Sequence, residues 1–423
     1  MSRLGTSRVQ SALDADSLEH SPPLTKDDIQ TPDQIEDHFG VITYSKGSNI
    51  HYMLLNILGT TVYRNGLQNY LSTNKYKSTT PDDFAAALQE SADEKPWPLK
   101  DSITIKAVID SWALKPGYPV LTVLRDYESA KPQAVVSQKR FLAHEPSDPA
   151  ALDSKWVIPI SFNSVYDDES EFTNVLQESD DEKTMDLPSS LLPNNYLYIN
   201  KEQAGFYRVN YDIRNWMNLA KGASRLDAAS RATLIDDLYA LNRAGLVDTW
   251  IVLWHLQSTL GDTSRSGERD MAPWITAAKV INGYNALARG DPELTTYLQT
   301  YLSAILRPAF ESIGWTSDDD TEADSYQRSV VRDIITQLAC GAGLAECRRQ
   351  ALRTFAYQYN DDNDDNTFDP NVLTATLCMG VKTMYPAYAT ELVDLAVNTE
   401  DVTTKASYLR AAGCTKQSDI VQT

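Results

Sequence analysis

The sequence has few of the residues from which most catalytic and metal sites are built. It contains five histidines and four cysteines among 423 residues, and no two histidines follow the H-x-x-x-H spacing of a helical zinc motif. It also has no glycine-rich phosphate loop and no G-x-S-x-G nucleophile motif. We therefore expect the chain to bind no metal and no cofactor by itself.

Positive charge is also scarce. The chain has 38 lysines and arginines against 58 aspartates and glutamates, which gives a formal net charge of −20. Proteins that bind nucleic acids or anionic membrane surfaces need basic patches, so this balance argues against both kinds of partner. The acidic residues are clustered in short runs that we interpret as solvated loops. These runs span residues 167–171, 178–183, 317–324 and 361–369.

The last acidic run partly resembles a calcium-binding loop. Asp361, Asn363 and Asp365 alternate in it as the ligands of an EF-hand do. However, Asn366 stands where that loop needs glycine, and Val372 stands where it needs glutamate. We reject a calcium site here.

Long hydrophobic runs are missing as well. The most apolar stretch, residues 246–256, is interrupted by Asp248 and His255, and no run reaches the 18 or more residues of a membrane span. Residues 1–20 lack the apolar middle of a signal peptide. We expect no transmembrane helix, signal peptide or lipid anchor in this chain.

The composition and length are those of a globular protein with several domains. Single cores stop growing near 250 to 300 residues, so two to four domains are expected. Residues 1–114 read as helical: apolar residues recur at helical spacing in 50–58, and Thr80 with Pro81 predicts a helix start. Residues 115–211 contain short β-branched and aromatic runs, which predict about seven antiparallel strands and a small β-sandwich.

Helical patterns continue from residue 212 to 423. Here Ser230 predicts a helix cap and Gly245 predicts the end of that helix. Successive amphipathic segments of 10 to 18 residues with short connections indicate an α-solenoid of irregular repeats. The predicted fold is thus multidomain and mainly α, with one small β domain in the middle.

The four cysteines leave two interpretations open on their own. The glycines between Cys340 and Cys347 allow the chain to turn back, so a short bridge there is geometrically possible. Cys378 and Cys414 form a second candidate pair. Two disulfides in an oxidising compartment and four free thiols in the cytosol both fit the spacing.

Several segments resemble one known family. "ITYSKGSNIHYML" (42–54) resembles the [ST]-Y-x-K-G segment of the aminopeptidase N family of zinc metallopeptidases. The resemblance continues in order through "NKYKSTTPDDFAAAL", "IDSWALKPGYPVLTV", "YINKEQAGFYRVNYD" and "RATLIDDLYALNRAGLVD". One departure is that His51 and Tyr52 stand where the family usually has an aliphatic residue and an arginine.

The resemblance implies a fold and a division into domains. Residues 1–114 would be the helical C-terminal part of a thermolysin-like catalytic domain. Residues 115–211 would be the β-sandwich, and 212–423 a HEAT-like α-solenoid that is incomplete at its C-terminus. The zinc-binding H-E-x-x-H helix of the family would lie upstream of Met1, so we expect Met1 to begin a truncated or misannotated product, or an engineered fragment.

The resemblance also implies roles for individual residues. Tyr44 would donate a hydrogen bond to the oxyanion that forms when a zinc-bound water attacks the scissile carbonyl of a peptide. Lys46 and Gly47 would support the turn that carries it. Cys340 with Cys347, and Cys378 with Cys414, would form the two disulfides of an extracellular or cell-surface enzyme.

Two functions from different classes follow. The first is the C-terminal part of a zinc aminopeptidase that removes N-terminal residues from peptides and is inactive without the zinc-binding half. The second is a non-catalytic module that binds peptides or proteins on the same fold. The sequence indicates no oligomeric state and no residue preference.

Overall fold

A computed structural model of the chain describes residues 3–95, 97–129, 131–164, 172–261, 268–316, 326–359 and 369–415. It contains two compact units, Met1–Trp254 and His255–Thr423. The acidic runs at 167–171 and 317–324 and the rejected calcium loop, up to residue 368, lie outside the described residues. The division into three domains at residues 114 and 211 stays a prediction.

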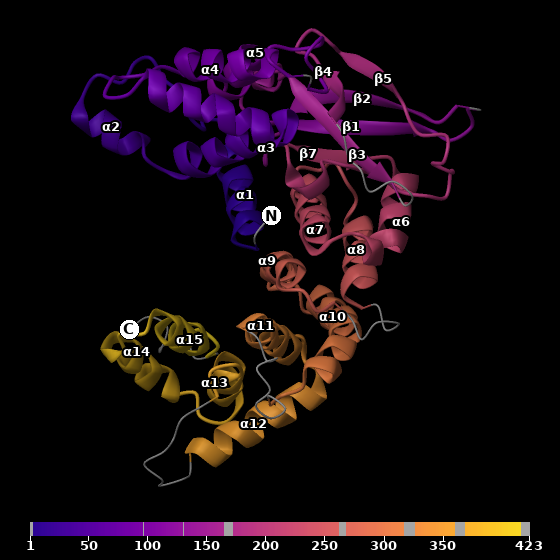
Figure 1. Cartoon of the computed structure of the whole chain (residues 1–423). Helices are drawn as coiled ribbons and strands as arrows, with labels where there is room; N and C mark the ends of the chain where they lie inside the picture. Colours follow the sequence, from indigo (N-terminus) through magenta and orange to yellow (C-terminus); the bar gives the residue numbers. More distant parts are fainter. Residues whose placement is uncertain are drawn as a thin grey trace. The chain divides into compact units, whose positions relative to one another are not determined.

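The first unit begins with helices. They are α1 (Arg3–Asp16), α2 (Pro32–His38), the π-helical turn η1 (Ile42–Lys46), α3 (Gly47–Thr73), α4 (Pro81–Asp93) and α5 (Ile105–Ala113). The predicted start at Thr80 is confirmed: its hydroxyl accepts the Asp83 N–H in a capping box. Gly59, with φ of 74°, breaks α3 into two pieces, and α4 packs between α3 and α5 (Figure 1).

Two small sheets follow the helices. One has the strand order β5 (Glu182–Asp186), β2 (Gln133–Arg140), β1 (Pro119–Asp126), β7 (Arg208–Tyr211), and the other has the order β4 (Phe172–Leu176), β3 (Ile158–Ser164), β6 (Leu197–Ile199). The prediction of antiparallel strands is wrong for one pair, because β7 returns along β1 in parallel. The prediction of a loop at 178–183 is partly wrong, because Glu182 and Lys183 pair with β2 as an edge strand.

The first unit ends in helices, the first two of which pack against strands. They are α6 (Ile213–Gly222), α7 (Ala228–Arg243) and the first half of α8 (Thr249–Leu260). The cap of α7 is Asp227, whose carboxylate accepts the Ser230 N–H, so the prediction of Ser230 as the cap is wrong. The helix ends where predicted, and Gly245 has a φ of 73°.

The second unit is helical throughout its described residues. Its elements after α8 are α9 (Met271–Ala288), α10 (Pro292–Ile313), α11 (Tyr326–Ala342), α12 (Ala345–Tyr359), α13 (Leu373–Thr383), α14 (Tyr388–Asn398) and α15 (Val402–Ala412), drawn in orange to yellow in Figure 1. Disulfides join Cys340 to Cys347 and Cys378 to Cys414. In the described parts of the chain, the helices that are long enough to cross a membrane are not apolar enough to do so.

Candidate functional site

Tyr44 lies in the π-helical turn that precedes α3. The Gly47 N–H donates to the Ile42 carbonyl, five residues back, and the Tyr44 N–H donates to Gly40. A π-turn contains one residue more than an α-helical turn, and such turns are frequent at functional sites. The Tyr44 side chain is 66% exposed and touches the Phe39 ring. Its phenol is therefore presented to the outside of this unit.

Lys46 comes from the same turn and points the other way. Its side chain is 0% exposed, and its Nζ lies 2.9 Å from Asp16 Oδ2. The ammonium also donates to the carbonyls of Gly117 (2.9 Å) and Lys115 (3.2 Å). Burial lowers the pKa of Lys46, and the Asp16 carboxylate opposes that effect.

Asp16 was not found from the sequence. It ends α1, thirty residues before Lys46, and its Oδ1 also accepts the Gly117 N–H at 3.0 Å. Gly117 has a φ of +77°, and a Cβ there would lie 2.6 Å from Nε of Arg140. No spacing rule joins an aspartate to a lysine across such a distance in the sequence, so no signal could have found the pair.

His51 and Tyr52, the departures from the family pattern, have partners in this chain. The His51 ring nitrogen Nδ1 lies 2.7 Å from the Tyr63 hydroxyl. The Tyr52 hydroxyl donates to Glu202 at 3.5 Å, and burial raises the pKa of Tyr52. The first contact joins two parts of α3, and the second joins α3 to the loop before β7.

That loop has an unusual backbone. Asn200, Glu202 and Gln203 all have φ between 54° and 66°, in the left-handed region that side chains other than glycine seldom adopt. The Asn200 amide stabilises the loop by donating to the carbonyls of Gly205 and Tyr207 and accepting the Gly205 N–H. Both polar atoms of the Gln203 side chain are buried without a partner among the described residues. The loop is therefore a strained feature that sequence reasoning missed.

A buried ionic cluster joins α1, β7 and α7. Arg208 Nη1 lies 2.7 Å from Asp236 and 2.8 Å from Asp237, and Nη2 lies 3.5 Å from Asp14. Since two buried carboxylates share one nitrogen of the guanidinium, they repel each other. Burial raises the pKa of Asp237 to about 7, against the opposing effect of Arg208.

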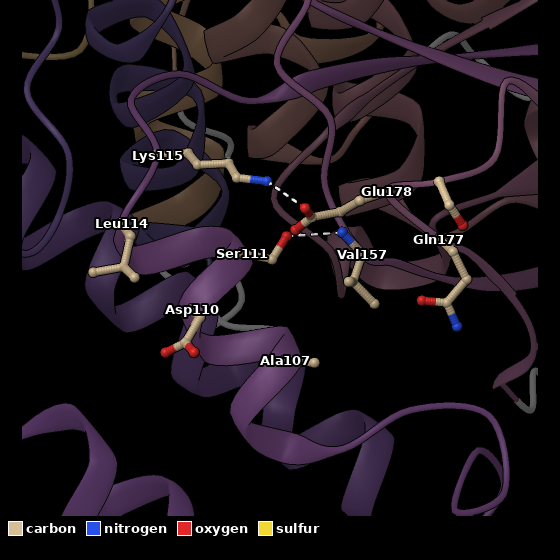
Figure 2. A pocket seen from close by; sticks show the side chains of 9 residues that line it. Ala107, Asp110, Ser111, Leu114, Lys115, Val157, Gln177 and Glu178 are labelled. Carbon is tan, nitrogen blue, oxygen red and sulfur yellow. Dashed lines mark hydrogen bonds and ion pairs between the residues drawn. The ribbon is translucent and has the colours of Figure 1, made fainter.

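A cavity of about 520 Å³ lies between α5 and the loops that flank β3 and β4. Figure 2 shows Lys115 paired with Glu178 across it and the Ser111 hydroxyl directed at the backbone of Val157. The Lys115 ammonium also donates to the Lys155 carbonyl at 2.6 Å. Since Lys115 and Ser111 bond to residues on the opposite side, this cavity is part of the packing contact between α5 and the loops that flank β3 and β4.

A second cavity, of about 660 Å³, lies within the second unit among α9, α11, α13 and α15. Arg289, Lys382 and Arg410 line it, with Asp333 as a carboxylate. Burial raises the pKa of Asp333, while Gln337 and Arg410 oppose that effect. The Thr374 hydroxyl lines the cavity, buried and without a partner in the described part of the chain. The cavity has the charge to accept an anion.

Across the described ranges, no group of three or more histidine, cysteine, aspartate or glutamate side chains is arranged to hold a metal ion. Structural and catalytic zinc sites need three or four such ligands.

Two family models match the chain. The model of the ERAP1-like C-terminal domain matches residues 196–423, and that of the Peptidase family M1 domain matches residues 1–112. Together they match the N-terminal and C-terminal parts of the chain, where the sequence resembles the family.

Curated relatives agree with these models. Aminopeptidase A of Gloydius brevicauda is 31% identical over 339 residues, which cover 78% of this chain and 32% of the relative. Aminopeptidase Ey of Gallus gallus is 31% identical over 392 residues, with coverages of 89% and 37%. Aminopeptidase N of Oryctolagus cuniculus is 29% identical over 393 residues, with coverages of 88% and 38%.

The chain thus spans about a third of the length of the curated relatives that it matches. The matched family models and the curated relatives lead to the same conclusion as the resemblance: the chain belongs to peptidase family M1, the aminopeptidase N family.

Proposed function

We propose that this chain is the C-terminal part of an aminopeptidase that removes N-terminal residues from peptides, and that Tyr44 donates a hydrogen bond to the oxyanion formed at the scissile carbonyl. The single observation that carries the proposal is the exposed Tyr44 phenol on a π-turn that is held from beneath by the fully buried side chain of Lys46. A phenol is a neutral donor at pH 7, and a fixed donor stabilises developing charge more than it stabilises the substrate.

The test is Tyr44→Phe in the enzyme in which this chain is joined to its upstream half. We expect kcat to fall by roughly 10² to 10³ with little change in KM, because one oxyanion donor is lost. Tyr76→Phe is the matched control, since Tyr76 is also an exposed tyrosine of the same unit. Equal turnover in both variants would show that Tyr44 has no catalytic role.

The finer features of the fold belong to the same proposal. We propose that residues 1–114 complete a thermolysin-like domain, that the two sheets form a β-sandwich, and that residues 212–423 form a HEAT-like solenoid. Two disulfides support an extracellular or cell-surface location, because disulfides persist in oxidising compartments. The zinc of the complete enzyme would then be held by residues outside this chain.

The cavity of the second unit favours one alternative function, a peptide-binding module without chemistry. Its three cationic side chains and the unpartnered Thr374 hydroxyl suit a carboxylate. Titration calorimetry of the chain with a peptide that has a free C-terminal carboxylate, and with its C-terminal amide, tests this function. Weaker binding of the amide, and of the acid to Arg410→Ala, supports the module, whereas equal binding contradicts it.

For the chain alone, we expect no hydrolysis of an aminoacyl anilide above the buffer rate when zinc is added. A rate well above buffer that a chelator abolishes would contradict this expectation. It would place the zinc site within these 423 residues.

A further inference from the structure

We propose that Lys46 is a positioning residue, which fixes the π-turn of Tyr44 to the segment between α5 and β1 and to the end of α1. The catalytic consequence of this inference rests on the proposed function of Tyr44. The anchoring itself is a property of this chain. Lys46 does not touch substrate, because its side chain is fully buried while Tyr44, two residues earlier, faces outward.

The ammonium of Lys46 has three N–H donors. It donates to the carbonyl oxygens of Gly117 and Lys115, at 2.9 and 3.2 Å, and forms an ion pair with Asp16 Oδ2 at 2.9 Å. The Phe206 ring lies 5.7 Å away on another side of the same nitrogen. Every hydrogen bond of the head group therefore goes to a segment remote in sequence, and none goes to its own helix.

These acceptors are themselves held in place. The Gly117 N–H donates to Asp16 Oδ1, so the same carboxylate binds both the ammonium and the segment that the ammonium contacts. The Lys115 side chain pairs with Glu178 at 2.7 Å (Figure 2) and also donates to the Lys155 carbonyl. The π-turn is thus tied, through Lys46 and residues 115–117, to the loops that flank β3 and β4.

A purely stabilising role explains this arrangement poorly. A buried ion pair recovers its desolvation cost only with excellent geometry, and replacement by apolar side chains of similar volume is often neutral for stability. What an apolar side chain cannot reproduce is the pair of directional bonds to two backbone carbonyls. The chemistry of Lys46 is therefore suited to setting the position of the turn.

The test separates position from stability by means of a double variant. Lys46→Met alone leaves Asp16 buried without its partner and can prevent folding, so Asp16→Leu is combined with it. Lys106→Met is the control, because Lys106 of α5 forms an exposed ion pair with Asp82 of α4. Hydrogen exchange by mass spectrometry on the full chain follows the amides of residues 42–48, and urea unfolding measures stability.

We expect the amides of residues 42–48 to exchange at least roughly tenfold faster in the double variant than its change in the free energy of unfolding accounts for, because the turn has lost its anchor. The control should leave this exchange unchanged. In the joined enzyme, kcat should fall by roughly tenfold or more while KM holds, since a small displacement of an oriented group is costly.

Unchanged exchange at residues 42–48 in a folded double variant would overturn the proposal. The proposed function fails by a different measurement, namely unchanged turnover in Tyr44→Phe. Fast exchange combined with that second result would keep Lys46 as the anchor of the turn and remove the catalytic role of Tyr44.

Discussion

At the scale of single residues, the cluster around Arg208 predicts how stability depends on pH. Asp237 has a pKa of about 7 in the folded chain, against about 3.9 for an unperturbed aspartate. The folded state therefore binds more protons than the unfolded state between pH 4 and 7. The stability that this group contributes is complete below pH 4 and is lost as the pH rises through 7.

We therefore expect the free energy of unfolding of the first unit to decrease between pH 5 and 7, by at most about 1.4 kcal/mol per pH unit from this group. Urea titrations at a series of pH values measure it. Asp237→Asn should flatten the curve, whereas Asp153→Asn, which changes an exposed carboxylate, should not. The same slope in wild type and Asp237→Asn would contradict the assignment.

The sequence predicts some residues of the candidate site and not others. Tyr44 and Lys46 stand in one short segment, so a local pattern is enough to single them out. Asp16, Asp236 and Asp237 act through partners that only the tertiary structure brings near, and their separation in sequence carries no periodic signal. Left-handed backbone at Glu202 and Gln203 is equally hidden, because neither residue type favours it.

At the scale of elements, the cap of α7 can be tested directly. Asp227 accepts the Ser230 N–H at 3.0 Å and the Ser230 hydroxyl at 2.6 Å. Asp227→Ala should cost about 1 kcal/mol of stability, while Asp227→Asn, which keeps an acceptor, should lie within a few tenths of the wild type. Chemical unfolding of the three proteins checks this, and equal stability of all three would contradict the capping role.

The reason for the mistaken cap is physical. Both Asp227 and Ser230 are good capping residues, and they stand three positions apart, so the sequence allows two starts for one helix. Thr80 had no such competitor, because Pro81 fixes the first helical position after it. Strand β5 was missed because edge strands carry charge, which makes them resemble loops.

At the scale of the whole chain, both disulfides belong to the second unit. The bridge from Cys378 to Cys414 closes a loop with a sequence separation of 36, which contributes roughly 4 kcal/mol in the chain-entropy estimate. The first unit contains no cysteine, since all four lie beyond residue 254.

A reducing agent should therefore lower the unfolding temperature of the second unit and leave that of the first unit unchanged. Differential scanning calorimetry with and without reductant measures this, and Cys378→Ala with Cys414→Ala should reproduce the shift for the longer bridge. A reductant that moves both transitions equally would show that the two units unfold as one.

The mainly helical architecture with a small β part was predictable because composition and periodicity differ sharply between the segments. The parallel pairing of β1 with β7 was not predictable, since it depends on where the chain re-enters the sheet after some eighty residues. Sequence periodicity reports which face of an element is buried but not which neighbour it pairs with.

The anchoring of Lys46 to two carbonyls constrains the length of the linker between α5 and β1. Lys115 and Gly117 present their oxygens to one nitrogen, so a residue inserted or deleted between them would displace one acceptor. Surface loops generally tolerate such changes. Here, natural variants with a longer or shorter linker should be rare. The spacing between Lys115 and Gly117 should persist even where another residue replaces Pro116.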